Sequence, residues 1–207
     1  MYKLCVSEQS AQRQRELEAG LLELMLIRDY EDITVSDLCD HLQVPRKTFY
    51  RYFSGKDGAL HALLDHTLLE YPLPVGPASE QAIYSSMETY FRFWKSQKPL
   101  LDALARSGLT SELIHRSLIL TMTDGSISVR RSPADDLLTH EHVIVYTLSG
   151  LLSLVILWHR SGFQETISRM AASAHRLLRQ SLFALHSNAP LPLAMLFTRV
   201  QTRVLFL

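Results

Sequence analysis

Apolar side chains recur along most of the chain at the three- and four-residue spacing of an amphipathic helix. Val35, Leu38, Cys39 and Leu42, for example, fall at i, i+3, i+4 and i+7, which places them on one face of a short helix. No segment shows the strict alternation with β-branched residues that indicates a strand. The pattern therefore predicts an all-α protein.

Turn-forming segments divide the chain into nine predicted helices. Thr34 to Asp37, Ser54 to Asp57 and Ser132 to Asp135 each place an acid three residues after a hydroxyl, which is the signature of a capped helix start. Proline and glycine in segments such as 72–77 and 161–162 separate the pieces. The helices are predicted at 8–28, 35–42, 45–51, 55–70, 78–97, 99–106, 109–122, 134–159 and 163–186.

The proline-rich segment 72–77 separates two kinds of sequence. Four helices, two of them very short, precede this segment, and longer apolar helices that contain Trp94 and Trp158 follow it. The apolar tail 188–207 is compatible with a tenth helix, a partner-binding arm or a disordered end. The pattern of this tail does not favour one of the three.

One apolar run invites comparison with a membrane span. Val143 to Trp158 carries no charge over sixteen residues, but a bilayer needs about 20. Thr147, Ser149 and Ser153 also interrupt the run. We therefore predict a helix that is buried on nearly all sides within the protein, with no membrane association.

Composition and charge restrict the classes of function. The 21 basic and 21 acidic side chains of the 207-residue chain cancel, so any site for a polyanion must be a local patch. Cys5 and Cys39 are too few for a disulfide framework, and no signal peptide opens the chain. These features predict a soluble protein of the reducing cytoplasm.

The histidines and the short motifs give no indication of catalysis. His140 and His142 lie two apart on a predicted helix, so their rings point about 200° apart and cannot share one metal ion without a third ligand. His61 and His66, five apart, fail for a similar reason. The chain has no phosphate-binding glycine loop, nucleophile elbow or zinc-protease motif. We therefore expect no enzyme activity, no cofactor and no metal.

The stretch VPRKTFYRYF, Val44 to Phe53, concentrates positive charge. Residues 1–71 hold eight basic and twelve acidic side chains, yet residues 41–56 hold four basic and no acidic ones. If Val44, Phe49 and Phe53 cover the apolar face of helix 35–42, the two short helices form a helix-turn-helix. Arg46, Lys47, Thr48, Tyr50 and Arg51 then remain on the outer surface. These side chains suit DNA bases and phosphates, although an ordinary cationic surface helix would show the same pattern.

Tyr30 to Leu60, YEDITVSDLCDHLQVPRKTFYRYFSGKDGAL, resembles the N-terminal DNA-binding domain of the TetR family of bacterial transcription regulators. The shared features are a Thr-Val helix start, the helix-turn-helix, an aromatic-rich end of the recognition helix and a Phe-x-x-Lys-[Glu/Asp] opening of the next helix. The resemblance implies phosphate contacts at two helix starts, base contacts from the recognition helix and backbone contacts from its tyrosines. The DNA-binding residues are then Thr34, Arg46, Lys47, Thr48, Tyr50, Arg51, Tyr52 and Lys56. Helix 8–28 would pack behind them through Leu17, Leu21, Leu24 and Met25.

Two residues depart from the family pattern. Gln43 stands where such turns commonly have a glycine in the left-handed conformation, which costs up to about 1–2 kcal/mol for a residue with a Cβ. Lys47 stands where the family often has a small residue, and it would add positive charge at the groove. We therefore expect a slightly altered turn and either stronger non-specific binding or contact with an additional base.

The second half of the chain resembles the all-helical regulatory domains of the same family. WHRSGF, Trp158 to Phe163, is similar to a helix junction in a branch that includes regulators and coactivators of dihydroxyacetone metabolism. The resemblance implies a DNA-binding domain at 1–54 and an effector-binding and dimerisation domain at 55–207. Candidate pocket residues are Met87, Tyr90, Phe91, Trp94, Met122 and Tyr146. Candidate dimer residues are Gly150, Ser153, Ile167, Met170, Ala174 and Leu178. Both sets are also compatible with an ordinary core.

The combined expectation is a homodimeric regulator that binds a double-stranded DNA operator. In this interpretation a small-molecule effector releases or tunes a repressor. The alternative is a protein of the same fold that acts through a partner protein, as a coactivator or interaction module. A small enzyme would be a third class, but no motif supports it.

Overall fold

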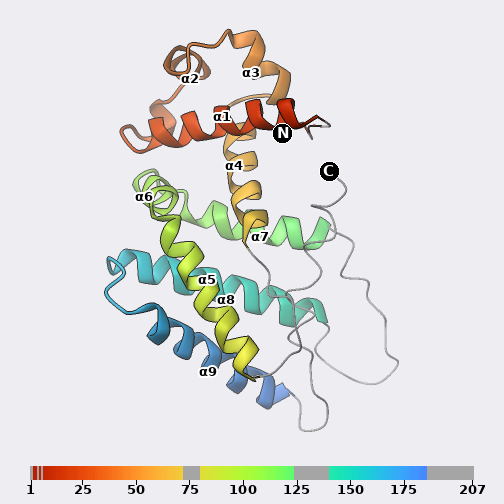
Figure 1. The fold of residues 1–207 in the computed structure, drawn as a ribbon, viewed down its shortest axis with the longest axis vertical. Helices are drawn as coiled ribbons and strands as arrows, with labels where there is room; N and C mark the ends of the chain where they lie inside the picture. Colours follow the sequence, from red (N-terminus) through yellow and green to blue (C-terminus); the bar gives the residue numbers. More distant parts are fainter. Residues whose placement is uncertain (1, 4, 6, 72–79, 124–139, 186–207) are drawn as a thin grey trace. The chain divides into compact units, whose positions relative to one another are not determined.

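The computed structural model describes residues 2–3, 5, 7–71, 80–123 and 140–185. The predicted helix start at 132–135, the segment 72–77 and the tail 188–207 lie outside this range. The helices are α1 (Glu8–Met25), α2 (Val35–His41), α3 (Arg46–Tyr52), α4 (Lys56–Glu70), α5 (Glu80–Ser96), α6 (Lys98–Arg106), α7 (Thr110–Thr123), α8 (His140–Arg160) and α9 (Ile167–Leu185), with a 3-10 turn, η1 (Tyr30–Asp32) (Figure 1). The all-α prediction is confirmed.

The chain folds as two compact units. The first contains residues up to Glu70 together with Lys98–Arg116, and the second contains Tyr71–Gln97 and the described residues from Ser117 onward. Helix α4 packs on α1 within the first unit, and α7 begins in the first unit and continues into the second. The predicted domain boundary at residue 54 stays a prediction. The first compact unit extends past that residue and includes α4.

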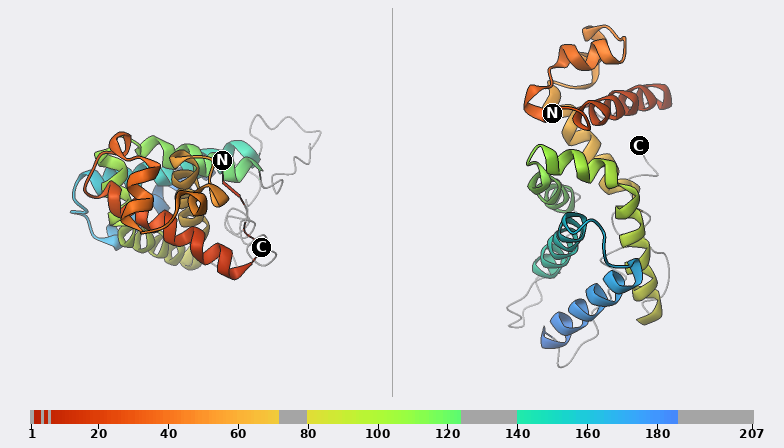
Figure 2. Two further views of the ribbon diagram at one scale, coloured as in Figure 1. Left: turned by 90° about the horizontal axis from the view of Figure 1, so that it is seen from above. Right: turned by 90° about the vertical axis from the view of Figure 1, so that its left-hand side faces the viewer.

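Helix α1 is the centre of the first unit. In the views of Figures 1 and 2, α2 and α3 lie on one side of α1 and α6 on the other, and α4 crosses it. The four apolar residues predicted to pack behind the recognition helix are all buried, namely Leu17, Leu21, Leu24 and Met25. Gly20 permits a close approach, because a Cβ there would lie 2.6 Å from a methyl group of Leu42. Helix α2 thus packs on the apolar face of α1, and α3 packs on α2.

A buried polar cluster connects three segments of this unit. The Tyr2 hydroxyl donates to Asp65 Oδ2 at 2.7 Å, and Arg116 donates to both oxygens of Asp65 at 2.8 and 2.5 Å. Asp65 is 1% exposed, and burial together with Asp65 raises the pKa of the Tyr2 phenol. The backbone N–H of Lys3 donates to Tyr52 O at 3.0 Å. The cluster therefore ties α4 and α7 to the segment that borders the end of α3.

Aromatic side chains fill the second unit, where α5 packs on α8 and α9. Trp158 lies edge-to-face on Phe91 and on Phe163, with ring centroids 5.7 and 4.7 Å away. Phe163 has a positive φ of 57°, and its N–H donates to Trp158 O at 2.9 Å, the bond of a helix C-cap. The WHRSGF segment is therefore a helix junction, and this left-handed turn explains why α9 begins at Ile167 rather than at 163.

Helix α8 differs from the prediction that it is buried on nearly all sides. Thr147, Leu151, Val155 and Trp158 are buried. The opposite face exposes Tyr146, Gly150, Ser153 and Leu157, which recur at helical spacing. Within the described ranges, no helix has the length and apolarity needed to cross a membrane. The apolar run is thus half core and half surface.

The turn between α2 and α3 has the predicted left-handed residue. Gln43 has φ 52°, and the next residue, Val44, donates its N–H to Cys39 O at 2.9 Å. This bond closes the end of α2 and directs the chain into α3. The Gln43 side chain is exposed, so only its backbone conformation is required here.

Replacement of Gln43 by glycine should stabilise the first unit. Glycine occupies the left-handed region without a Cβ penalty but loses more entropy on folding, so we expect a net gain of about 0.5–1 kcal/mol. Thermal unfolding measured by calorimetry tests this expectation. Gln43→Val is the control and should lower the melting temperature, because a β-branched residue is strained there. A Gln43→Gly variant that melted earlier than wild type would contradict the assignment.

Candidate nucleic-acid interface

The recognition helix α3 has only seven residues, and an aromatic cluster fixes its orientation. Phe49 is fully buried and packs on Phe53, with ring centroids 5.2 Å apart. Arg46, Lys47 and Arg51 are exposed, and Tyr50 is 54% exposed. The inward position of Phe49 thus leaves three cations and one phenol on the outer surface, as the spacing predicts.

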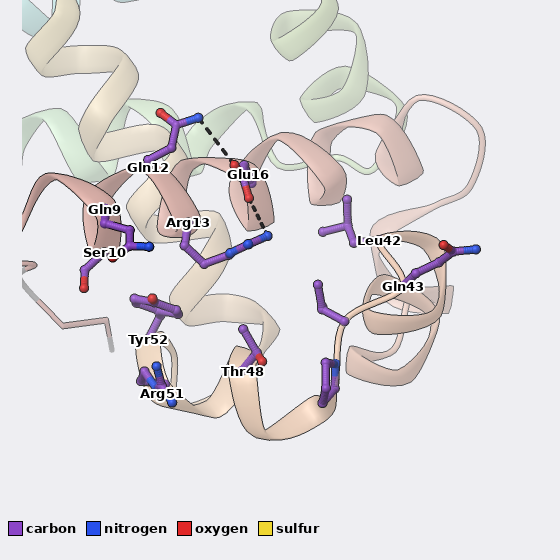
Figure 3. Close-up of a pocket in the computed structure, with 12 residues that line it drawn as sticks. Gln9, Ser10, Gln12, Arg13, Glu16, Leu42, Gln43, Thr48, Arg51 and Tyr52 are labelled. Carbon is purple, nitrogen blue, oxygen red and sulfur yellow. Dashed lines mark hydrogen bonds and ion pairs between the residues drawn. The ribbon is translucent and has the colours of Figure 1, made fainter.

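The side chains of Thr48 and Tyr52 do not point outward with the exposed cations of α3. Figure 3 shows both side chains on the side of α3 that faces α1. Thr48 is half-buried, and the Tyr52 side chain is only 6% exposed. Their predicted contacts with a base and with the DNA backbone therefore stay predictions, and only the edge of Tyr52 is available for such a contact.

Thr34 begins α2 with the predicted capping box. Its hydroxyl accepts the N–H of Asp37 at 3.1 Å, and Asp37 Oδ2 accepts the N–H of Thr34 at 2.8 Å. Hydrogen bonds from Thr34 lower the pKa of the Asp37 carboxyl. The Thr34 side chain is exposed, so a phosphate could approach the first turn of α2, where backbone N–H groups favour anions.

Lys56 has an intramolecular role that the resemblance does not indicate. Its ammonium group donates to Tyr30 O at 2.7 Å and to Glu31 O at 3.1 Å, and it lies 4.4 Å from the centroid of the Tyr30 ring. The Tyr30 hydroxyl donates to Asp57 Oδ1 at 2.6 Å. Lys56 thus joins the start of α4 to η1, and contact with a phosphate is left to its remaining N–H.

A hollow lies between α1 and α3 (Figure 3). It has a volume of about 670 Å³ and is lined by α1, the turn and the inner side of α3. Sequence reasoning did not identify the α1 residues, because their positions relative to α3 follow only from the packing. A signal was present in the sequence, since Gln9, Gln12 and Arg13 give the start of α1 a polar face.

The six candidate pocket residues do not form one group. Met87, Tyr90, Phe91 and Trp94 are buried in the second unit, whereas Met122 is 62% and Tyr146 is 64% exposed. Burial raises the pKa of the Tyr90 phenol well above its usual range. Among the described residues, the Trp94 indole N–H and the Tyr90 hydroxyl find no partner of accepted hydrogen-bond geometry. The two groups lie close enough for the Trp94 N–H to oppose part of the rise in the pKa of Tyr90, so any hydrogen bond that they make within this aromatic cluster is to each other.

The six candidate dimer residues also separate into two sets. Gly150 and Ser153 are exposed on the same face of α8, and no described atom lies within 4 Å of a Cβ built on Gly150. Ile167 and Met170 are half-buried. Ala174 and Leu178 are 1% and 6% exposed, because α9 packs on α5. Their burial leaves little surface for a partner.

Four of the described histidines, His41, His61, His66 and His115, each have a ring nitrogen within 4 Å of a glutamate oxygen. His66 Nδ1 lies 2.8 Å from an oxygen of Glu18, and His61 Nε2 lies 3.3 Å from Glu112. Glu18 is 2% exposed. No group of three metal-ligating side chains occurs within the part of the chain that the structure describes.

Comparisons with known proteins agree on the family and the fold. Residues 19–63 match the model of the bacterial regulatory proteins of the tetR family. This segment runs from the second half of α1 through α2 and α3 into α4. At the level of sequence, no curated protein matches the chain.

Three solved structures have the same fold. A tetR-family transcriptional regulator from Streptomyces coelicolor is 19% identical, with a TM-score of 0.55 over 92% of this chain and 88% of that one. The dihydroxyacetone kinase operon activator DhaS is 16% identical, with a TM-score of 0.54 over 84% of this chain and 98% of that one. The fatty acid degradation regulator FadR from Bacillus halodurans is 13% identical, with a TM-score of 0.52 over 80% of this chain and 94% of that one.

Identities this low show the fold alone, so the likeness to DhaS does not assign the chain to the dihydroxyacetone branch. The family model covers the helix-turn-helix, and the structure exposes the cations of its recognition helix. Residues 19–63 thus form a DNA-binding domain of the TetR family, in a chain whose fold is similar to that of solved TetR-family regulators.

Proposed function

We propose that the protein is a homodimeric repressor that binds an operator through α3 and is released by a small-molecule effector. The supporting observation is the island of positive charge on α3, since Arg46, Lys47 and Arg51 are exposed within a segment, 41–56, that has no acid. Arginine and lysine there can contact guanine edges and phosphates. A chromosomal operator would place the protein in the bacterial cytoplasm.

The aromatic cluster of the second unit is the proposed effector site. Trp94 N–H is a donor only, its contact with the Tyr90 hydroxyl does not reach good hydrogen-bond geometry, and a poorly paired buried donor is costly. An effector with an acceptor oxygen would offer the Trp94 N–H and the Tyr90 hydroxyl a better partner while its apolar part lies among the rings. Met87 and Phe91 are buried on the same helix, α5. Met122 and Tyr146 are exposed and are not needed for this site.

The proposed route from effector to DNA passes through α7 and α4. An effector changes DNA affinity only if it binds one arrangement of the recognition helices better than another. Helix α7 continues from the second unit into the first, where Arg116 holds Asp65 of α4. Helix α4 in turn begins at Lys56, which is bound to η1. A displacement of α7 would therefore reach the helix-turn-helix through charged hydrogen bonds and the α4 backbone.

The proposed dimer forms through the exposed face of α8. Tyr146, Gly150, Ser153 and Leu157 occupy one face at helical spacing, and the small residues at its centre permit close approach of a partner helix. One seven-residue helix contacts few base pairs. Two copies related by a two-fold axis would place their α3 helices in successive major grooves, about 34–36 Å apart.

The first prediction of this proposal is strongly salt-dependent DNA binding. Selection of genomic fragments with the purified protein should yield a site, and its affinity should fall steeply between 50 and 200 mM salt, because each neutralised phosphate contributes about −0.9 to the log–log slope. A coactivator that acts mainly through a packed protein interface would show little salt dependence. Selection that returned no enriched DNA would contradict the proposal and favour that alternative.

The second prediction separates base from backbone contacts. Arg46→Ala should cost about 1–3 kcal/mol on the selected site and relax the preference at one position. Tyr50→Phe should weaken selected and random DNA alike, because it removes a hydroxyl suited to phosphate. Fluorescence anisotropy on both DNAs provides the measurement. Equal losses on the two DNAs for Arg46→Ala would show that Arg46 does not contact a base.

The third prediction concerns the dimer. Leu157→Glu should yield monomers at micromolar concentration, since it places a charge within an apolar contact, and it should weaken operator binding. Ile27→Glu is the matched control, because Ile27 is similarly exposed but lies in the first unit, and it should remain dimeric. Sedimentation velocity distinguishes the two forms. A Leu157→Glu protein that sediments as wild type would exclude this face of α8.

A further inference from the structure

The hollow between α1 and α3 combines hydrogen-bond donors from two helices. Its α1 wall contains Gln9, Gln12 and Arg13, and its α3 wall contains Thr48 and Arg51. Figure 3 shows the Arg13 and Thr48 side chains within the space between the two helices. All of these residues belong to the first compact unit. The hollow therefore lies wholly within the first unit, between α1 and the helix-turn-helix.

The charge of the hollow suits an anion. Arg13 and Arg51 contribute two positive charges, and Glu16 contributes one negative charge. Arg13 Nη1 lies 2.6 Å from Glu16 Oε2, and the Gln12 amide donates to Glu16 Oε1 at 3.5 Å. The Arg13 and Glu16 side chains are 49% and 42% exposed. Glu16 thus holds both donors at the edge of the hollow, and a stronger anion can replace its carboxylate there.

The position and size of the hollow favour an extended ligand over a free ion. The hollow has a volume of about 670 Å³, which exceeds the roughly 30 Å³ per water by a factor of about 20. Arg51 belongs both to this lining and to the exposed cations of α3. A DNA strand next to α3 would therefore pass the mouth of the hollow.

We propose that this hollow receives the sugar–phosphate backbone of the bound DNA, with Arg13 of α1 and Arg51 of α3 on the same stretch of strand. Thr48 then donates its hydroxyl to a phosphate, and the Gln12 amide provides a further donor. Helix α1 becomes part of the DNA interface in addition to supporting α3. This inference rests on the proposed operator binding and extends it to a second helix.

Arg13→Gln tests the proposal on the full-length protein. Loss of one phosphate contact should reduce the log–log salt slope by about 0.9 and weaken selected and random DNA alike, by about fivefold at 0.1 M salt. The matched control is Arg169→Gln, because Arg169 pairs with Glu165 at 2.8 Å on the surface of the second unit. The control removes the same charge and should leave the slope unchanged.

Glu16→Gln provides a test with the opposite sign. It releases Arg13 and removes the negative charge from the hollow, so DNA affinity should rise by about two- to fivefold on both DNAs. The melting temperature of each variant serves to exclude unfolding. A general loss of structure would weaken binding in both variants, whereas the proposal requires one loss and one gain.

The possible results are distinguishable. In one outcome the wild-type protein binds DNA, and Arg13→Gln and Arg169→Gln have the same salt slope and the same affinity. That outcome would overturn the role of the hollow and leave operator binding intact. Selective loss on one DNA sequence would also overturn it, since that result indicates a base contact. Wild-type protein without affinity for any DNA would overturn both proposals.

Discussion

The DNA-binding surface depends on the burial of one side chain, Phe49. A helix of seven residues is too short to be stable in water, so α3 exists because its inner side packs on the rest of the unit. Full burial of a phenylalanine contributes about 1.5–3 kcal/mol. Because α3 can rotate only as far as Phe49 allows, that contact also determines which side chains face outward. The exposed cations, the inward Thr48 and the hollow next to α1 all follow from it.

Polar contacts then fix what apolar packing leaves free. The capping box of Thr34 sets the start of α2, and Lys56 joins α4 to η1 through two carbonyl oxygens. Tyr30 takes part twice, since its ring lies under Lys56 and its hydroxyl donates to Asp57. Charged hydrogen bonds are directional and stronger than neutral ones. The unit thus combines a non-directional apolar core with a few contacts that define helix positions closely.

The features that the sequence predicted well are local ones. The capping box at Thr34, the left-handed Gln43 and the inward Phe49 each depend on residues within about one helical turn. The family match depends on the segment that contains these residues. The all-α fold was predicted from the helical periodicity of apolar positions along the chain. The contacts of Lys56, the burial of Ala174 and the exposure of Tyr146 depend on residues far away in the chain, which spacing does not place. For the same reason, the α1 wall of the hollow became visible only in the folded unit.

The buried pair of Asp65 and Arg116 has a consequence for motion. Two parallel hydrogen bonds at 2.8 and 2.5 Å, with one partner 1% exposed, tolerate little sliding or tilting, because a half-broken pair leaves a desolvated charge. A position of α7 that breaks one of the two bonds is therefore higher in energy than the position observed, and small displacements of α7 would be resisted at Arg116. In the proposed mechanism, an effector would therefore have to supply at least the free energy that breaks the Asp65–Arg116 pair before α7 could move independently of α4.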